Sequence, residues 1–368
     1  MIEPGTEAEV AEAVRGAAGP LAIRGGGTRG PAGEGTPLSL ARLTGIRLHE
    51  PGALTLVVAA GTPMREVEDA LRVEGQRLAF EPMDHRGLLG TSGEPTIGGC
   101  VAAAASGPRR VQVGGCRDHL LGVRFVDGTG AAVKNGGRVM KNVTGYDLVK
   151  AMCGARGTLG VLTEVALKVL PATAASATLT LRGLDAGAAV RAMAAALGSP
   201  FEVTGAAWDG AATRLRIEGL EGSVAYRAGR LADLLAPHGA AEVERDPEAN
   251  AATWAAVRDV APFHGRAGDV WRVALRASDA PAAVAAAGGE ALLDLGGAAM
   301  WVLVPEGTDL RDRLKGLRAV AITVRGAAPR VGPQPPAIAA IEAGLRARFD
   351  PRGILNPGAM GPVAAAAA

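Results

Sequence analysis

Three glycine-rich segments in the first half of the chain contain the residue types that bind a phosphate. They are residues 24–30 (RGGGTRG), residues 96–107, and residues 141–160. Glycine lacks a Cβ atom and adopts positive φ without penalty, so consecutive backbone N–H groups can approach an anion closely. Arg24 and Arg29, in the first segment, can add charge-assisted hydrogen bonds, although a solvated surface charge is an equal alternative for Arg24. The three segments together indicate a site for a cofactor that carries a diphosphate.

The two common nucleotide-binding motifs do not account for the first segment. It matches G-x-G-x-x-G through Gly25, Gly27 and Gly30, but that motif needs a helix that begins at its third glycine. Pro31 and Pro37 follow and prevent such a helix. No G-K-[ST] closes the run, so a P-loop is also excluded. What remains is an irregular loop of N–H donors. A plain surface turn is the alternative for one such run, but three ordered runs favour a cofactor.

These segments resemble the FAD-binding domain of the vanillyl-alcohol-oxidase family, the PCMH type. The resemblance rests on the loop at 24–30, Thr-Ile-Gly-Gly at 96–99, Gly-Tyr-Asp at 145–147 and Gly-Thr-Leu-Gly-Val-Leu-Thr-Glu at 157–164. It implies an α+β fold. A PCMH-type FAD-binding domain of two α/β subdomains would be joined to an antiparallel-sheet cap domain with ferredoxin-like βαββαβ character.

The resemblance also implies where FAD would bind. The first loop would wrap the pyrophosphate, residues 96–107 would run along the isoalloxazine and ribityl chain, and residues 160–161 would lie near the adenosine end. Residues 349–358 are similar to a C-terminal segment that returns to the flavin in many relatives. The implied cofactor-binding residues are Gly25, Gly26, Gly27, Thr28, Arg29, Gly30, Pro82, Thr96, Gly98, Gly99, Ser106, Gly107, Gly157, Gly160, Val161 and Asn356. Covalently flavinylated relatives have a histidine where this chain has Thr28 and Arg29, so we expect noncovalent FAD.

Within that family, residues 106–110, 117–118, 139–147, 271–272 and 293–298 look like the FAD-binding E subunits of glycolate oxidases. This resemblance implies an FAD-dependent oxidoreductase subunit that carries electrons from the oxidation of glycolate, a 2-hydroxy acid, to a partner iron–sulfur subunit. A catalytic FAD homologue would complete the hetero-oligomer. The histidine-rich substrate motif of catalytic subunits is not found, and Ala155-Arg156 stands where catalytic relatives often have Ser-Glu. Two alternatives therefore stay open: a structural FAD-binding assembly subunit, and a stand-alone FAD-dependent 2-hydroxy-acid dehydrogenase.

Other polar residues each have a chemical and a structural interpretation, and no catalytic residue is assigned. His85 can be a base or a loop histidine without chemistry. Lys141 and Asp147 can orient the flavin edge, or form a salt link or a helix cap. Arg272 can bind a substrate carboxylate, or pair with Asp269 or Asp294.

Composition limits the class of protein. A chain of 368 residues with 48% hydrophobic residues predicts two globular domains, and a net charge of +2 without a basic run makes nucleic acid an unexpected partner. No apolar segment reaches the roughly 18 residues that a membrane helix needs. We therefore expect a cytoplasmic protein, either free or peripheral to the inner membrane through its complex.

Three cysteines, far apart in the sequence, favour buried thiols over a disulfide framework and are too few for an iron–sulfur cluster. The histidine spacing predicts no metal site.

The pattern of elements predicts the arrangement that must position these residues. A capping box at Thr6 and Glu9 opens a helix to about residue 18. Strands follow at 20–23 and 54–60, a helix at 62–75, a hairpin at 121–133, and a strand at 159–170 that Pro171 ends. The predicted domains are 1–171 for FAD, 172–332 for the cap, and 333–368 for a C-terminal segment with a helix at 337–349 that returns to the FAD domain.

The predicted cap begins with strand, helix, strand, strand, helix, strand between residues 178 and 244, which is the split βαβ pattern. A similar order recurs at 270–324. It predicts either a pseudo-repeat or one large antiparallel sheet with helices on one face.

Overall fold

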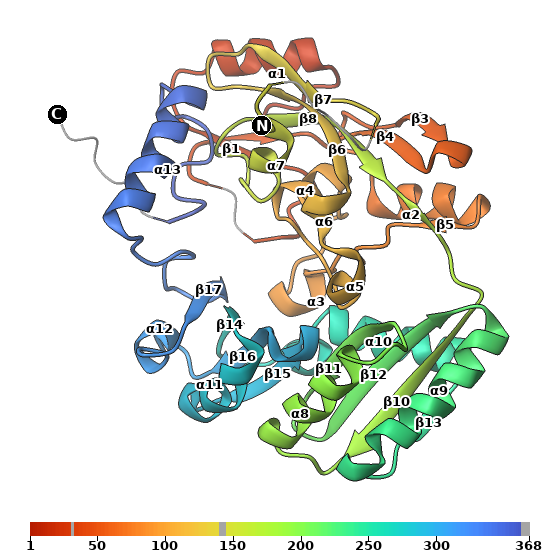
Figure 1. The fold of residues 1–368 in the computed structure, drawn as a ribbon. Coiled ribbons are helices and arrows are strands. Elements are labelled where there is room, and N and C mark those ends of the chain that lie inside the picture. Colours follow the sequence, from red (N-terminus) through yellow and green to blue (C-terminus); the bar gives the residue numbers. More distant parts are fainter. Residues whose placement is uncertain (31–32, 140–144, 362–368) are drawn as a thin grey trace. The chain divides into compact units, whose positions relative to one another are not determined.

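A computed structural model describes residues 1–30, 33–139 and 145–361. Within them the chain forms two compact units, whose elements are labelled in Figure 1. The first unit comprises Met1–Ala105, Gly115–Ala172 and the chain from Pro329 onward. The second comprises Ser106–Gly114 and Thr173–Ala328. Residues 106–114 lie within the range predicted for the FAD domain, but they pack with the second unit.

The first unit is built on a five-stranded antiparallel sheet. Its strands, in spatial order, are β3 (Ile46–Glu50), β4 (Thr55–Ala59), β8 (Val161–Lys168), β6 (Leu120–Val126) and β7 (Ala132–Gly136). Two further strand pairs are β1 (Leu21–Arg24) with β2 (Thr36–Ser39), which are parallel, and β5 (Gln76–Arg77) with β9 (Leu170–Pro171). Leu56, Val165 and Leu167 are completely buried, so the central strands β4 and β8 form the middle of the core.

Short helices surround this sheet. They are α1 (Glu7–Arg15), α2 (Met64–Val73), α3 (Arg86–Leu89), α4 (Ile97–Ala102), α6 (Cys116–His119), α7 (Leu148–Met152) and α13 (Pro336–Phe349), with a 3-10 turn η1 (Pro51–Ala53). The predicted cap at Thr6 is confirmed, because its hydroxyl accepts a hydrogen bond from the Glu9 N–H at 3.2 Å. The second bond of the predicted capping box differs: the Glu9 carboxylate accepts from the Gly5 N–H at 2.8 Å, one residue before the N-cap. Helix α1 ends at Arg15, a turn before the predicted end.

The second unit contains one eight-stranded antiparallel sheet, in the order β13-β10-β12-β11-β15-β16-β14-β17. Its strands are β10 (Ala175–Arg182), β11 (Val203–Trp208), β12 (Ala212–Gly219), β13 (Glu242–Glu244), β14 (Asp269–Leu275), β15 (Glu290–Asp294), β16 (Ala299–Val304) and β17 (Ala319–Arg325). Its helices are α5 (Arg110–Val113), α8 (Ala186–Leu197), α9 (Glu221–Leu235), α10 (Pro247–Arg258), α11 (Ala280–Ala287) and α12 (Leu310–Arg313), with 3-10 turns η2 (Ala236–His238), η3 (Ala261–Phe263), η4 (Ala277–Asp279) and η5 (Leu295–Gly297).

This sheet is a doubled ferredoxin-like fold. Strands β10 to β13 form one βαββαβ half and β14 to β17 form the other, each with its fourth strand beside its first and its second strand at the far end. The halves join where β11 meets β15, with Trp208 opposite Leu293. The pseudo-repeat and the single large sheet were predicted as alternatives, and both are present.

The two faces of this sheet differ in chemistry. Helices α8, α9, α11 and α12 cover one face and enclose its apolar core, which includes Leu179, Met193 and Val302. Side chains alternate along a strand, so Thr178 and Arg216 point to the opposite face, where the Trp254 indole of α10 meets both. The opposite face is therefore polar, and it is the face that carries α10 and the segment 106–114.

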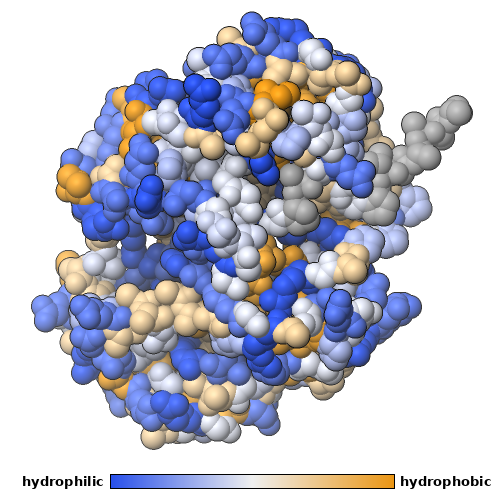
Figure 2. Space-filling view, turned by 180° about the vertical axis from the view of Figure 1, so that it is seen from behind, coloured by the Kyte–Doolittle hydropathy of each residue, from blue (hydrophilic) through white to orange (hydrophobic). Residues whose placement is uncertain are grey.

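Most large apolar side chains of the described residues are buried in the two hydrophobic cores. Figure 2 shows one face of the protein on which hydrophilic residues predominate and hydrophobic residues form small, separate patches. Among the described helices, none combines the length and the apolar character needed to cross a bilayer.

Candidate cofactor site

A cavity of about 270 Å³ lies in the first unit, among the glycine-rich segments. The residues that line it come from β1 and the loop after it, from α4, from the turn before β8 and from the C-terminal segment. The predicted cofactor residues that it brings together are Gly25, Gly26, Gly27, Thr28, Arg29, Gly30, Thr96, Gly98, Gly99, Gly157, Gly160 and Asn356. Pro82 and Val161 belong to the same unit but lie outside the lining, and Ser106 and Gly107 belong to the second unit.

The first loop needs glycine because other backbone segments approach it closely. A Cβ atom on Gly26 would lie 1.6 Å from the Glu94 carbonyl oxygen, and one on Gly98 would lie 2.7 Å from the Ala60 carbonyl oxygen. Gly27 and Gly30 have φ of 70° and 100°, which favours glycine. At the second segment, the Thr96 hydroxyl accepts a hydrogen bond from the Gly99 N–H at 3.2 Å and so caps α4. The loops thus present backbone along the cavity, as an anion site requires.

Asn356 joins the C-terminal segment to the first and third glycine segments. Its Oδ1 accepts a hydrogen bond from the Ile23 N–H at 2.6 Å, and its Nδ2 donates to the Ile23 carbonyl at 3.2 Å and to the Arg156 carbonyl at 2.8 Å. The Leu21 N–H also donates to the Ile354 carbonyl at 2.7 Å. The end of the chain is therefore part of the cavity wall.

The cavity contains cationic side chains. The Arg29 Nε atom is buried without a hydrogen-bond partner. The Arg156 Nη1 donates to the Arg29 carbonyl at 3.2 Å, and burial, with the like charges of Arg330 and Arg29, lowers the pKa of Arg156 to about 9. An arginine stays charged at neutral pH, so Arg156 is a cation that is partly withdrawn from water beside two like charges. The cavity fits a diphosphate-bearing group such as FAD, with glycine N–H groups and arginines as its donors.

His85, the candidate base, lies beside these arginines. Its side chain is 8% exposed, and its Nδ1 atom has no hydrogen-bond partner. Burial, with the charges of Arg29, Arg156 and Arg330, lowers the pKa of His85 to about 3. The ring is therefore neutral at physiological pH and a poor proton acceptor.

The other candidates have structural surroundings. Asp147 caps α7, because its carboxylate accepts from the Lys150 N–H at 3.3 Å, whereas Lys141 lies outside the described residues. In the second unit, the Arg272 guanidinium lies 5.6 Å from the centre of the Trp301 ring. Burial and the charge of Arg110 lower the pKa of Arg272, while Asp294 raises it. Of the two acids considered for Arg272, Asp294 is thus the near one, and Asp269 accepts from the Gly307 N–H instead.

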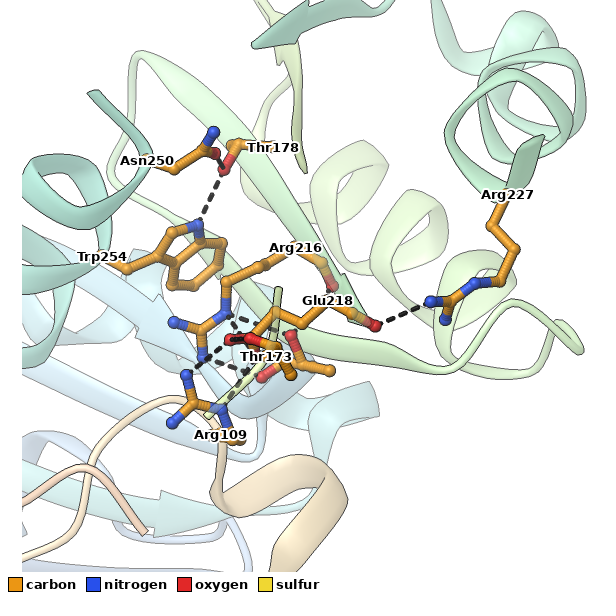
Figure 3. Close-up of polar contacts among 9 residues, drawn as sticks. Arg109, Thr173, Thr178, Arg216, Glu218, Arg227, Asn250 and Trp254 are labelled. Carbon is orange, nitrogen blue, oxygen red and sulfur yellow. Dashed lines mark hydrogen bonds and ion pairs between the residues drawn. The ribbon is translucent and has the colours of Figure 1, made fainter. Parts of the chain in front are cut away.

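A buried ion cluster in the second unit was not predicted. Figure 3 shows Arg109 pointing at Glu218 on β12, with Arg216 and Trp254 beside it. Arg109 donates two hydrogen bonds of 2.8 Å to the Glu218 carboxylate, and Arg216 Nε lies 3.5 Å from the same carboxylate. The Arg216 guanidinium stacks 4.5 Å above the Trp254 ring. This cluster fastens residues 106–114 to the polar face of the sheet.

The three cysteines are buried free thiols. Although far apart in the sequence, they meet in the core of the first unit, where hydrogen bonds to Cys100 and Cys153, with burial, raise the pKa of the Cys116 thiol well above its ordinary value. Across the described ranges no group of three histidine, cysteine or acidic side chains has a geometry that could hold a metal ion.

Comparison with known proteins agrees with this geometry. A family model described as an FAD binding domain matches residues 1–136. The structure is similar to that of an alkyldihydroxyacetonephosphate synthase, with a TM-score of 0.71 at 16% identity over 96% of this chain and 76% of that one. At this identity the likeness concerns the fold alone. The fold is that of a protein with a PCMH-type FAD-binding domain, with mixed α+β architecture and antiparallel sheets.

The sequence relatives define the family more closely. The chain is 34% identical over 352 residues to glycolate oxidase subunit GlcE of Escherichia coli (strain K12), which covers 93% of this chain and 92% of the relative. It is 31% identical over 157 residues to D-lactate dehydrogenase of Archaeoglobus fulgidus, covering 41% of this chain and 33% of that protein. The chain belongs to the family of FAD-binding glycolate oxidase subunits to which GlcE belongs.

Proposed function

We propose that the chain is the FAD-binding E-type subunit of a glycolate oxidase-type complex, in which it passes electrons from a 2-hydroxy acid to a partner iron–sulfur subunit. A catalytic FAD homologue is the other expected partner. The E. coli relative that matches almost end to end is named a glycolate oxidase subunit, which supports assignment to a complex.

One observation of the cavity carries the proposal. The polar side chains among its described lining residues are those of Arg24, Thr28, Arg29, Thr96, Arg156 and Asn356. None of these side chains accepts a proton at neutral pH, and neighbouring His85 is a poor base. A cavity with many donors and no base suits cofactor binding, whereas an enzyme that oxidises a hydroxy acid alone needs a proton acceptor.

We further propose that the residues gathered at the cavity hold noncovalent FAD. When bound, FAD would supply the hydride and single-electron chemistry. The glycine loops would donate backbone N–H groups to the diphosphate, the arginines would balance its charge, and Asn356 would hold the loop after β1 in place. The described lining contains no histidine, cysteine or tyrosine that could form a covalent flavin bond.

Expression of the chain alone, and together with a catalytic FAD homologue and an iron–sulfur subunit, tests the proposal. We expect the chain alone to hold acid-releasable FAD that glycolate does not reduce, and the complex to show glycolate-dependent bleaching of this flavin. Rapid reduction by glycolate without partners would instead identify a stand-alone dehydrogenase. A colourless chain that FAD cannot reconstitute would identify an assembly subunit.

A further inference from the structure

Three arginines from distant parts of the sequence gather beside the glycine-lined cavity. Arg29 lies in the first loop, Arg156 directly precedes Gly157, and Arg330 lies in the segment that returns to the first unit. Arg29 and Arg156 line the cavity, and the charge of Arg330 acts on Arg156 and on His85. The cluster is therefore assembled by the fold.

The described surroundings of Arg156 compensate its charge poorly. Its guanidinium donates to the carbonyl of Arg29, not to a carboxylate. The acid whose pKa Arg29 helps to lower, Asp84, is already held by Arg86 through hydrogen bonds of 2.8 to 3.1 Å. Buried like charges are costly unless an opposite charge joins them. An anion in the cavity would remove that cost.

The backbone of Arg156 is held firmly in place. Its N–H donates to the Ala102 carbonyl at 2.9 Å, and its carbonyl accepts from Asn356 Nδ2 at 2.8 Å. Its φ of 52° lies in the left-handed region, where a side chain other than glycine costs on the order of 1 kcal/mol. The backbone of Arg156 is thus fixed beside the cavity that this residue lines, and binding to such a fixed segment costs less freedom.

We propose that Arg156 and Arg29, which both line the cavity, form a cationic clamp for the diphosphate of FAD, an inference that rests on the proposed FAD-binding role. A diphosphate carries two charges and enough acceptor oxygens for several guanidinium groups and the glycine N–H groups together. A single carboxylate carries one charge and two oxygens, so it would compensate less of the positive charge at this site than a diphosphate does. Arg156 is therefore a binding residue that determines affinity for the diphosphate part of the cofactor.

Titration of the apo chain with FAD, followed by flavin fluorescence, tests the clamp. We expect Arg156→Gln to raise the Kd at least about 10-fold, the equivalent of one charge-assisted hydrogen bond. Arg156→Lys should lie between Gln and the parent. Arg72→Gln removes an exposed arginine of α2 and should leave the Kd unchanged. Far-ultraviolet circular dichroism of each variant checks that the first unit is folded.

Inorganic pyrophosphate gives a test that needs no variant. It should raise the melting temperature of the apo parent chain and compete with FAD, whereas acetate at the same ionic strength should do neither. An unchanged FAD Kd in folded Arg156→Gln, or protection by acetate but not by pyrophosphate, would overturn the clamp. If the parent chain bound no FAD, but pyrophosphate raised the melting temperature of the parent and not that of folded Arg156→Gln, the proposed function would fail and the anion site would stand.

Discussion

Arg109 and Glu218, 109 positions apart in the sequence, form a two-pronged ion pair in which both side chains are less than 10% exposed. Arg216, two residues before Glu218 on the same strand, β12, also forms an ion pair with this carboxylate. One negative charge thus serves two buried guanidinium groups. The pair fixes the segment 106–114, which begins within the last two residues of the second glycine segment, to the sheet of the second unit.

Replacement of Glu218 tests how much that pair matters. Glu218→Ala leaves two buried arginines without their acid and should destabilise the second unit by about 3–5 kcal/mol. All four tryptophans lie between residues 208 and 301, so tryptophan fluorescence during urea unfolding reports this unit selectively. Glu242→Ala breaks a fully exposed pair with Arg182 and should leave the midpoint unchanged. Equal effects of the two substitutions would refute the structural role of Glu218.

Gly26→Ala should weaken FAD binding strongly. The new methyl group would collide with the Glu94 carbonyl, and a backbone atom cannot move aside cheaply as a side-chain tip can. We expect the Kd for FAD to rise at least about 100-fold, which corresponds to roughly 2.7 kcal/mol. Gly52→Ala is the matched control, because its Cβ would meet open space. Retention of parental affinity by Gly26→Ala would show that the loop does not contact the cofactor.

Asn356→Ala should weaken both the first unit and its FAD affinity. The substitution removes three hydrogen bonds and leaves buried groups of Ile23 and Arg156 unsatisfied, each at a cost of about 1–3 kcal/mol. Asn356→Asp keeps the acceptor for the Ile23 N–H but removes both donated bonds, so it should not restore affinity. Asn250→Ala is the control in the second unit. It should change the tryptophan fluorescence and leave the Kd for FAD unchanged. Parental FAD affinity in Asn356→Ala would contradict this role.

His85 should make the first unit less stable as the pH falls. Its pKa is lowered in the folded chain to about 3 from an ordinary 6.5. Below pH 6.5 the His85 imidazole is protonated in the unfolded chain but stays neutral in the folded chain. The free energy of unfolding therefore falls progressively toward pH 3, by at most about 1.4 kcal/mol per pH unit. His85→Gln should therefore lose less stability than the parent between pH 7 and pH 5 in urea unfolding followed by circular dichroism. Identical pH profiles would show that His85 does not carry the effect.

Local patterns predicted the elements that neighbouring residues determine. The Thr6 cap identified the start of α1, and the patterns of the second unit predicted the order of its strands and helices along the chain. Strand β2 was missed because it contains Pro37, which the turn rules read as a breaker, although an edge strand tolerates it. Pro171 was predicted to end a strand, yet it pairs with Gln76 in β9.

Contacts between residues far apart in the sequence could not be predicted from local sequence patterns. The family resemblance named most of the residues that line the cavity, but it did not point to Arg330, and it marked Arg156 only as a departure from the usual Ser-Glu. The meeting of three cysteine thiols, and the pairing of Arg109 with Glu218, depend on how strands and loops pack. A charge reversal at a family position, such as Arg156, is the one local signal that would have directed attention to the cluster.

The bonds of Asn356 have a consequence for how the protein is made. Ribosomes release the chain from its N-terminus, and Ile23 with the adjoining glycine loop emerges more than three hundred residues before its partner does. During that interval the second unit, whose residues are consecutive from 173 to 328 apart from the earlier segment 106–114, can complete most of its folding. The wall of the cavity that Asn356 forms with Ile23 and Arg156 can close only after residue 356 has been made, so the cofactor site is completed after the residues of the second unit have emerged.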